Sequence, residues 1–190
     1  IPLLASIFQF CDVRTILRVR SVHLSWLNAT RSPIAWRDAS FRPYDGASFR
    51  AIPSMTLAPL RILNLEMVND LNDHDLLQHV QPLAALYYID MGSCAQLTHV
   101  GIAHLLPLTQ LRTLMLTGVL TGMDQAMNTI CSLPHLTNLC MNMMENDVTD
   151  VGMSHITRLA GTLTCLVMAN CQLVGEATFE SISHCTLLHT

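Results

Sequence analysis

Residues 86–102 read LYYIDMGSCAQLTHVGI, and this stretch holds one complete unit of the pattern that decides the fold. Ile89 and Met91 are two positions apart, which is strand spacing, so both side chains face the same side of a short strand. Cys94 and Leu97 then turn inward, and a helical run follows. A strand, a turn and a helix therefore fit into about 25 residues. Such a unit cannot bury its apolar side alone and needs copies on either side.

Four further copies of this unit occur in the sequence. Each copy opens with leucine and places apolar residues three and five positions later, as Leu86, Ile89 and Met91 do. Because the copies recur every 25 to 27 residues, we expect the units to stack side by side and to bury a continuous core between them. The five opening positions are Leu60, Leu86, Leu111, Leu136 and Leu163.

The units resemble leucine-rich repeats of the type that has cysteine at the asparagine position, followed by an L-T-D-x-G-like segment. Cys94, Cys171, LTHVG at 97–101 and VTDVG at 148–152 carry this resemblance, which covers about residues 57–190. It implies an α/β fold, a solenoid with a curved parallel β-sheet and outer helices. Residues 60–190 would then hold about five repeats and a truncated sixth.

The register of the repeat predicts where the elements lie. We expect short parallel strands centred near residues 63–65, 89–91, 114–116, 139–141 and 166–168. Helices should follow near residues 73–81, 99–106, 123–132, 150–160 and 175–184. Four aspartates lie at the turns of the repeats, where aspartate commonly caps the helix that follows: Asp73, Asp75, Asp147 and Asp150.

The composition is that of a folded chain without a membrane span. Of the 190 residues, 51% are hydrophobic and 13% charged, so the chain can bury a sizeable core. Charged residues or histidine interrupt every hydrophobic stretch, and no run of 18 apolar residues exists. The chain begins with Ile, and Leu187 and Leu188 enter a sixth repeat. We therefore expect a fragment cut at both ends, whose targeting signal would be lost.

The cysteines and histidines form no pattern typical of a disulfide framework or a metal site. The seven cysteines are an odd number without C-x-x-C pairs, and we expect reduced thiols in the cytoplasm or nucleus. The nine histidines fall mostly on expected turns and helices, and none pairs with cysteine or a carboxylate at the spacing of a structural zinc site. The expectation is that the protein has no metal site and no cofactor.

Residues 1–41 do not follow the repeat, and we expect them to form a short all-helical module. Apolar residues of the first run follow a helical period, and Asp12 is suited to N-cap a second helix. Ser32-Pro33 ends that helix, and Trp36 follows as a second aromatic anchor. The apolar side chains expected to face inward from the second helix are Ile16, Leu17, Val19, Val22 and Trp26.

This N-terminal stretch resembles the F-box, whose motif runs I-F-x-F-L-D, L-L-R-V-R-x-V, C-x-x-W and P-x-L-W. The corresponding segments here are IFQFCD at 7–12, ILRVRSV at 16–22, HLSW at 23–26 and PIAW at 33–36. The chain departs from the family at Cys11, where the family has leucine, and at His23, where it usually has cysteine. Ile1-Pro2 is out of register with the family's leading L-P dipeptide, so the first contact helix would be incomplete.

In the F-box family these helices dock on the Skp-type adaptor of a cullin-based ubiquitin ligase. Three short helices make a small independent core, so some apolar side chains should pack on a partner, and helix-in-groove docking suits them. Without the resemblance, the same residues would be read as ordinary core. The resemblance implies these adaptor-binding residues: Leu3, Leu4, Ile7, Phe8, Phe10, Ile16 and Leu17. Trp26 and Trp36 should contribute more to the packing of the module itself.

Residues 42–59 join the two parts of the chain. Three prolines and a glycine in this segment indicate turns and extended chain. Ile52 and Leu57 are also compatible with a degenerate first repeat that caps the array. The segment is therefore expected to be either a linker or a capping repeat.

Charge divides at the same boundary. Residues 1–59 carry a net charge of +4, whereas residues 60–190 carry −8. Nucleic-acid binding needs a basic footprint. The acidic repeat array therefore argues against a nucleic-acid partner.

A binding surface is expected on the concave face of the sheet. Residues between the two inward-facing positions of each strand point to this face, where parallel strands arrange them in rows. Each could be an ordinary exposed sheet residue, but an exposed aromatic or methionine side chain beside acids can anchor a partner. The residues expected to contact an unknown protein substrate are Glu66, Tyr88, Asp90, Met115, Asn138 and Asn142.

The chain contains no G-x-S-x-G, P-loop, H-E-x-x-H or clustered Cys/His dyad, so we expect no catalytic activity. Together the two resemblances imply a substrate-recognition subunit of a Skp–cullin–F-box ubiquitin ligase, cytoplasmic and/or nuclear. It would hold a target near the ubiquitin-loaded enzyme and so direct the target to degradation. The alternative is a repeat scaffold or inhibitor that binds a protein without a ligase role. A hydrolase is a more remote class, for which no residues can be named.

Overall fold

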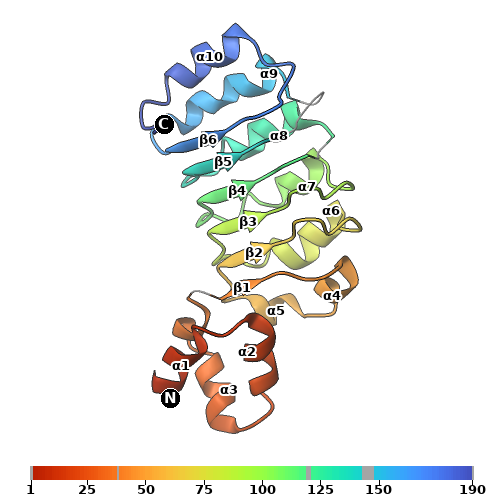
Figure 1. Ribbon diagram of the computed structural model, residues 1–190, viewed down its shortest axis with the longest axis vertical. Helices are drawn as coiled ribbons and strands as arrows, with labels where there is room; N and C mark the ends of the chain where they lie inside the picture. Colours follow the sequence, from red (N-terminus) through yellow and green to blue (C-terminus); the bar gives the residue numbers. More distant parts are fainter. Residues whose placement is uncertain (1, 38, 119–120, 143–147, 190) are drawn as a thin grey trace.

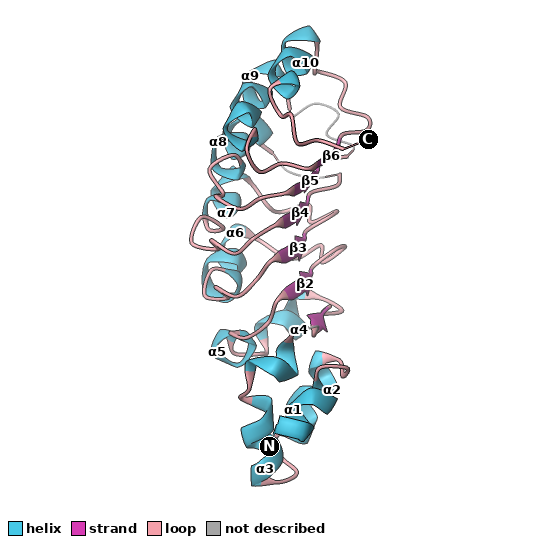
Figure 2. Ribbon diagram, turned by 90° about the vertical axis from the view of Figure 1, so that its left-hand side faces the viewer, coloured by secondary structure: helices cyan, strands magenta, loops and turns pink. Residues whose placement is uncertain are grey.

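The computed structural model describes residues 2–37, 39–118, 121–142 and 148–189. In these residues the chain is an α/β protein with one six-stranded parallel sheet, in which the strands lie in chain order from β1 to β6. Figure 1 shows the strands stacked one above the next, with the N-terminal helices at one end. Figure 2 shows the strands along one side of the stack and the later helices along the opposite side.

The strands are short and parallel, which confirms the expected pairing. They are β1 (Ser40–Phe41), β2 (Ile62–Asn64), β3 (Tyr88–Asp90), β4 (Thr113–Met115), β5 (Asn138–Cys140) and β6 (Cys165–Val167). From β2 onward each strand begins one residue earlier than expected. The second inward residue lies just past the strand but remains tied to the neighbouring unit, as the Leu65 N–H donates to the Asp90 carbonyl at 2.7 Å.

The inward-facing residues form a continuous core. Leu63 pairs with Ile89, and the same register continues through the later strands. The inward pairs of the units that contain β2 to β5 are at most 1% exposed, and burying each such side chain contributes about 1.5–3 kcal/mol. Leu166 and Met168 of the last unit are only partly buried. The core is therefore thickest in the middle of the stack.

Strand β1 was not expected from the sequence. It pairs with β2 through Ser40 and Phe41 and lies inside the range assigned to the helical module. Two helices follow in the segment between the two parts, α4 (Gly46–Arg50) and α5 (Ser54–Leu57). Phe41 occupies the sheet position of Leu63 and is buried. This stretch is thus a strand and two short helices packed on the first regular unit.

The helices of the later units are shorter and less regular than expected. They are α6 (Asp73–Asp75) with the π-helical turn η2 (Leu76–Val80), α7 (His99–Ala103), α8 (Met123–Ile130), α9 (Asp150–Met153) with the 3₁₀ helix η3 (Ser154–Leu159), and α10 (Glu176–Ser183). Each has only enough residues to cover the core before the chain returns to the next strand. None of the described helices is long and apolar enough to cross a membrane.

Aspartates link several neighbouring units. The Asp73 carboxylate accepts hydrogen bonds from the Thr98 N–H at 2.8 Å and the Thr98 hydroxyl at 2.6 Å. Asp124 holds Thr149 in the same way, at 2.8 and 2.7 Å. These contacts correct the expectation that Asp73 caps its own helix, because the N-cap there is Asn72. The bonds fix the turn of one unit against the helix start of the next.

Asp150 makes the same kind of link to the last unit, accepting from the Gly175 N–H at 2.7 Å and from Thr178. The N-cap of its own helix is Thr149, so the expected cap is wrong here too. Asp75 does join the capping box of its helix with Asn72, as expected. Asp147, the fourth of the expected caps, lies outside the described residues.

Four short helices form the N-terminal module: α1 (Pro2–Phe8), α2 (Val13–Val19), α3 (Leu24–Thr30) and the 3₁₀ helix η1 (Pro33–Trp36). Asp12 caps α2 as expected, accepting from the Thr15 N–H at 2.6 Å. The expected second helix is divided, because the His23 side chain accepts from the Ser25 N–H at 3.1 Å and starts α3. Val22, expected inward, lies in this break and is 64% exposed.

The core of the module is built around its two tryptophans. Trp36 is buried, and its indole N–H donates to the Thr30 carbonyl at 2.6 Å. The rings of Phe8 and Trp26 meet edge to face with centroids 5.7 Å apart. These contacts agree with the expectation that both tryptophans contribute to the packing of the module itself.

Candidate protein-binding surfaces

The outer face of the sheet carries the predicted substrate-contact residues. Tyr88 and Asp90 flank the buried Ile89 on β3, and the register places Asp90 beside Met115 of β4. Glu66 and Asn142 lie two residues past the ends of β2 and β5, and all of these side chains are partly exposed. The alternation along each strand therefore confirms that they share the face away from the helices.

Acidic groups dominate the N-terminal half of this face. The Glu66 carboxylate forms an ion pair with Arg42 at 3.0 Å. Asp90 accepts a hydrogen bond from the Gly92 N–H at 2.9 Å. Burial raises the pKa of Asp90 above its ordinary value, and the neighbouring Glu66 adds to this shift. Glu66 is therefore already paired within the chain, whereas Asp90 can accept hydrogen bonds or positive charge from a partner.

Tyr88 lies against this acidic group. Burial raises the pKa of its phenol, and the charges of Asp90 and Glu66 raise it further. The phenol thus stays protonated at neutral pH and is able to donate a hydrogen bond. Together, Tyr88, Asp90, Glu66 and Met115 offer an aromatic ring, two carboxylates and a flexible thioether on adjacent strands, which suits contact with a protein.

The two predicted asparagines are engaged inside the molecule. The Asn142 carbonyl oxygen accepts from the Ala169 N–H at 2.9 Å, and its amide donates to the Cys140 thiol at 3.2 Å. The Asn138 carbonyl oxygen accepts from the Thr137 hydroxyl at 2.7 Å. Asn142 in particular ties its unit to the next one. These side chains therefore contribute less to the candidate surface than the residues on β3.

The predicted adaptor-binding residues divide into two groups. Leu3, Ile7 and Phe10 are 74%, 50% and 82% exposed. Leu3 and Ile7 lie four residues apart on one side of α1, and Phe10 lies in the turn that follows α1, where its N–H donates to the Ile7 carbonyl at 3.2 Å. Leu4 and Leu17 are partly buried.

The other two predicted adaptor-binding residues, Phe8 and Ile16, are buried in the module. The prediction that they present a docking surface is therefore wrong. Phe8 packs against Trp26, and Ala5, three residues before it on α1, is buried with it. The inward side of α1 therefore holds Ala5 and Phe8, and the outward side holds the exposed residues. Two exposed residues that sequence reasoning did not place there, Val22 and Leu24, add to the apolar surface of the module.

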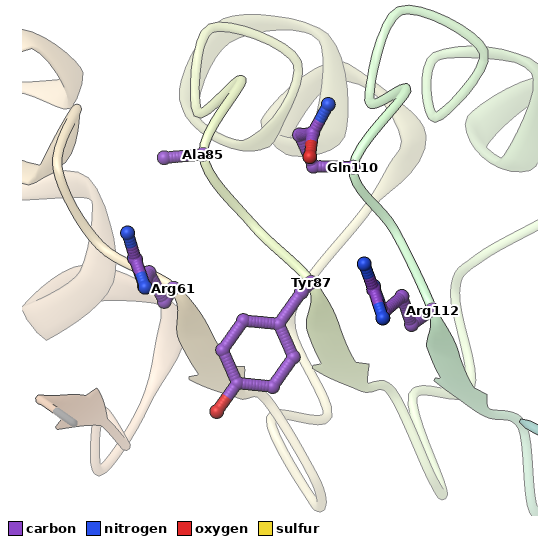
Figure 3. Close-up of a pocket in the computed structure, with 5 residues that line it drawn as sticks. All are labelled: Arg61, Ala85, Tyr87, Gln110 and Arg112. Atoms are coloured by element: carbon purple, nitrogen blue, oxygen red, sulfur yellow. The ribbon is translucent and has the colours of Figure 1, made fainter. Parts of the chain in front are cut away.

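A hollow of about 440 Å³ lies at the end of the sheet where the strands begin. Arg61, Tyr87 and Arg112 line it, each one residue before β2, β3 and β4, together with Ala85 and Gln110 (Figure 3). Sequence reasoning counted the two arginines only as charges. The available signal was that arginine, tyrosine and arginine occupy the same position in three successive units.

Comparisons with known proteins do not assign a function to the chain. A scan of protein-family models and a search of curated proteins find no match to this chain. Among the described residues, no group of three or more His, Cys, Asp or Glu side chains is placed to hold a metal ion.

Cys94 and Cys131 are buried thiols of the core. Burial raises the pKa of Cys94 and of Cys131 to about 12 each. The Cys94 thiol donates to the Leu65 carbonyl at 3.1 Å, which places it at the inward turn as expected. A protonated, buried thiol is a poor nucleophile and a poor metal ligand. These cysteines therefore serve packing between units.

Proposed function

We propose that this protein is the substrate-recognition subunit of a Skp–cullin–F-box ubiquitin ligase. The observation that carries the proposal is the apolar surface formed by Leu3 and Ile7 of α1 and by Phe10 of the turn after it, all largely exposed. The resemblance of residues 7–36 to the F-box supports it and names the partner as a Skp-type adaptor. A leucine-rich-repeat array would then carry the target.

Exposed side chains of this size are costly to leave in water. Each contributes about 1.5–3 kcal/mol when it is buried, and contiguous apolar surface on a small module is typical of a docking site. The opposite side of α1 is already used, since Phe8 packs on Trp26. The outward side is therefore free to enter an apolar groove, as short amphipathic helices do.

The repeat array supplies a second surface, remote in sequence from the first. The face around Tyr88 and Asp90 lies on β3, whereas the docking residues lie on α1 and the turn that follows it. No catalytic group is needed in this arrangement, because holding a target near an enzyme raises its effective concentration. Ubiquitin transfer would be the work of the other subunits.

The proposal is tested by capture of the full chain on a Skp-type adaptor. The double variant Ile7→Ala/Phe10→Ala removes two large exposed side chains, one from α1 and one from the turn that follows it. Central interface anchors cost about 2–4 kcal/mol when truncated, and about 3 kcal/mol weakens binding more than a hundredfold. We expect the double variant to lose adaptor capture at micromolar concentration, with an unchanged circular dichroism spectrum.

Phe179→Ala is the matched control, because Phe179 is 68% exposed on α10 at the other end of the stack. It should bind the adaptor as the unaltered chain does. If the unaltered chain shows no measurable adaptor binding, the ligase role is wrong and a scaffold or inhibitor takes its place. If the double variant binds as well as the control, the docking surface is not the exposed side of α1.

A further inference from the structure

The hollow at the start of β2, β3 and β4 places two arginines where no acid neutralises them. Among the described residues, the guanidinium groups of Arg61 and Arg112 take part in no ion pair and no hydrogen bond. The third arginine of the array differs, because Arg158 donates to the Asn128 side chain at 2.7 Å. The two free groups stand out further because residues 60–190 carry a net charge of −8.

The backbone holds the arginines at a fixed spacing. The N–H groups of Tyr87 and Tyr88 donate to the Arg61 carbonyl at 3.0 and 3.2 Å, and those of Arg112 and Thr113 donate to the Tyr87 carbonyl at 2.8 and 2.9 Å. Adjacent strands lie about 4.8 Å apart, so the two arginines are about 10 Å apart at the backbone. Both side chains can therefore reach one group placed between them.

The walls of the hollow suit an anionic side chain. Figure 3 shows Tyr87 between the two arginines, whose guanidinium groups extend toward the level of Ala85 and Gln110. The small side chain of Ala85 leaves the space open, and Gln110 offers an amide donor on the other side. A volume of about 440 Å³ exceeds that of a phosphate group, so it also accommodates the side chain that bears the phosphate.

We propose that this hollow binds a phosphorylated side chain of a protein target, with Arg61 and Arg112 donating to the phosphate oxygens. Guanidinium groups bind phosphate through paired, charge-assisted hydrogen bonds, and a phosphate monoester carries up to two negative charges at neutral pH. A carboxylate carries only one, which fits two unpaired arginines less well. The inference rests on the proposed function in one respect, that the repeat array holds a target protein.

The test uses the full chain and short synthetic peptides that carry phosphoserine or phosphotyrosine between alanines. Binding is followed by calorimetry and by the ¹⁵N shifts of the arginine Nε groups. We expect at least one phosphopeptide to bind and to shift the Arg61 and Arg112 signals, and inorganic phosphate to displace it. Affinity should rise from pH 5 to pH 7.5, because the second phosphate pKa is about 6 while arginine stays charged.

Four variants separate this site from a general charge effect. Arg61→Gln and Arg112→Gln should each weaken phosphopeptide binding at least tenfold, whereas Arg158→Gln, which removes the same charge elsewhere on the array, should not. Ala85→Leu keeps both arginines but fills the hollow, and it should also weaken binding. Equal loss with Arg158→Gln would overturn the assignment.

Three other results contradict the proposal: binding that is as tight for the unphosphorylated peptide, binding that is as tight for a glutamate peptide, and no binding of either phosphopeptide at 10 mM, a concentration on the order of the weakest useful affinities. Failure here is distinguishable from failure of the proposed function. The Ile7→Ala/Phe10→Ala variant should still bind the phosphopeptide, and Arg61→Gln should still be captured by the adaptor.

Discussion

The carboxylate of Asp90 is held in its charged form at a cost to the stability of the fold. Its single backbone donor is the Gly92 N–H, and it is partly buried beside Glu66. Desolvation penalises the charged form, so the pKa of Asp90 is raised from its ordinary 3.8. A group kept at such a cost on a binding face is more useful to a partner than to the free chain.

Asp90→Asn should therefore stabilise the free chain at neutral pH. A carboxylate whose pKa is raised in the folded state destabilises the fold as pH rises through that pKa, and below its ordinary pKa of 3.8 the effect vanishes. The asparagine oxygen can still accept from the Gly92 N–H. The urea midpoint of Asp90→Asn should exceed that of the unaltered chain at pH 7 and should converge with it below pH 3.8.

Asp150→Asn is the control of opposite sign. Hydrogen bonds from Thr178 and Gly175 lower the pKa of Asp150, so its stabilising effect is present at neutral pH and is lost as pH falls below 3.8. Asp150→Asn should lower the urea midpoint at pH 7. A midpoint for Asp90→Asn below that of the unaltered chain at pH 7 would show that its charge stabilises the fold.

Which single residues face inward was predictable where the strand period decides it. Leu63 and Ile89 are buried as the alternation requires. Ile16 is buried, as the helical period indicates, and only the F-box resemblance placed Ile16 and Phe8 on the adaptor surface. The burial of Phe8 was not predictable from a short helix, because it depends on contact with a ring distant in the sequence, that of Trp26. Arg61, Tyr87 and Arg112 recur at one position of the repeat, but the hollow that they line was missed because its shape also depends on the return loops that carry Ala85 and Gln110.

Several links between units depend on the close approach of an aspartate to the next helix. Asp124 accepts from the Thr149 N–H at 2.8 Å and from the Gly152 N–H at 3.1 Å. A Cβ added at Gly152 would lie 2.8 Å from the Asp124 Cα. Glycine is therefore required at this position by space and not by backbone angle.

Gly152→Ala should destabilise the chain for this reason. The backbone of α9 or the turn at Asp124 would have to move, and overpacking of this kind costs about 1–3 kcal/mol. Gly161→Ala is the matched control, because a Cβ there meets nothing within 4 Å. The urea midpoint should fall for Gly152→Ala and stay within error for Gly161→Ala. Equal midpoints for the two variants would mean that the units adjust freely at this joint.

The strands and helices were predictable where leucine recurs at the repeat positions. The strands from β2 to β6 and the helices after them lie where the repeat places them, with strands shifted by one residue. Strand β1 was missed because Phe41 and Pro43 stand where later units have leucine. The turn types of η2 and η3 were also not predictable, since they follow from how far the chain must return.

The stability of each unit depends on how many neighbouring units it packs against. Every strand from β2 to β5 pairs on both sides, whereas β6 pairs only with β5 among the described residues. The last unit also leaves an open hollow of about 400 Å³ whose lining is mostly apolar: Leu166, Met168, Val174, Thr178, Phe179, Ile182, Leu188 and His189. In stacked repeats, stability is approximately a sum of unit and neighbour contributions. The middle of this chain should therefore resist opening more than its last unit.

Truncation of equivalent leucines in a middle and a last unit measures this difference. Leu114 is fully buried on β4 between two neighbours, and Leu114→Ala should cost about 2–5 kcal/mol. Leu166 holds the same position on β6 but is only partly buried, so Leu166→Ala should cost clearly less. In the unaltered chain, amide hydrogen exchange should be slower at Leu116, bonded to the Cys140 carbonyl at 2.8 Å, than at His189, bonded to the Thr164 carbonyl at 3.0 Å. Equal costs and equal exchange rates would mean that the units unfold in one cooperative step, and the sum of neighbour contributions would not describe this chain.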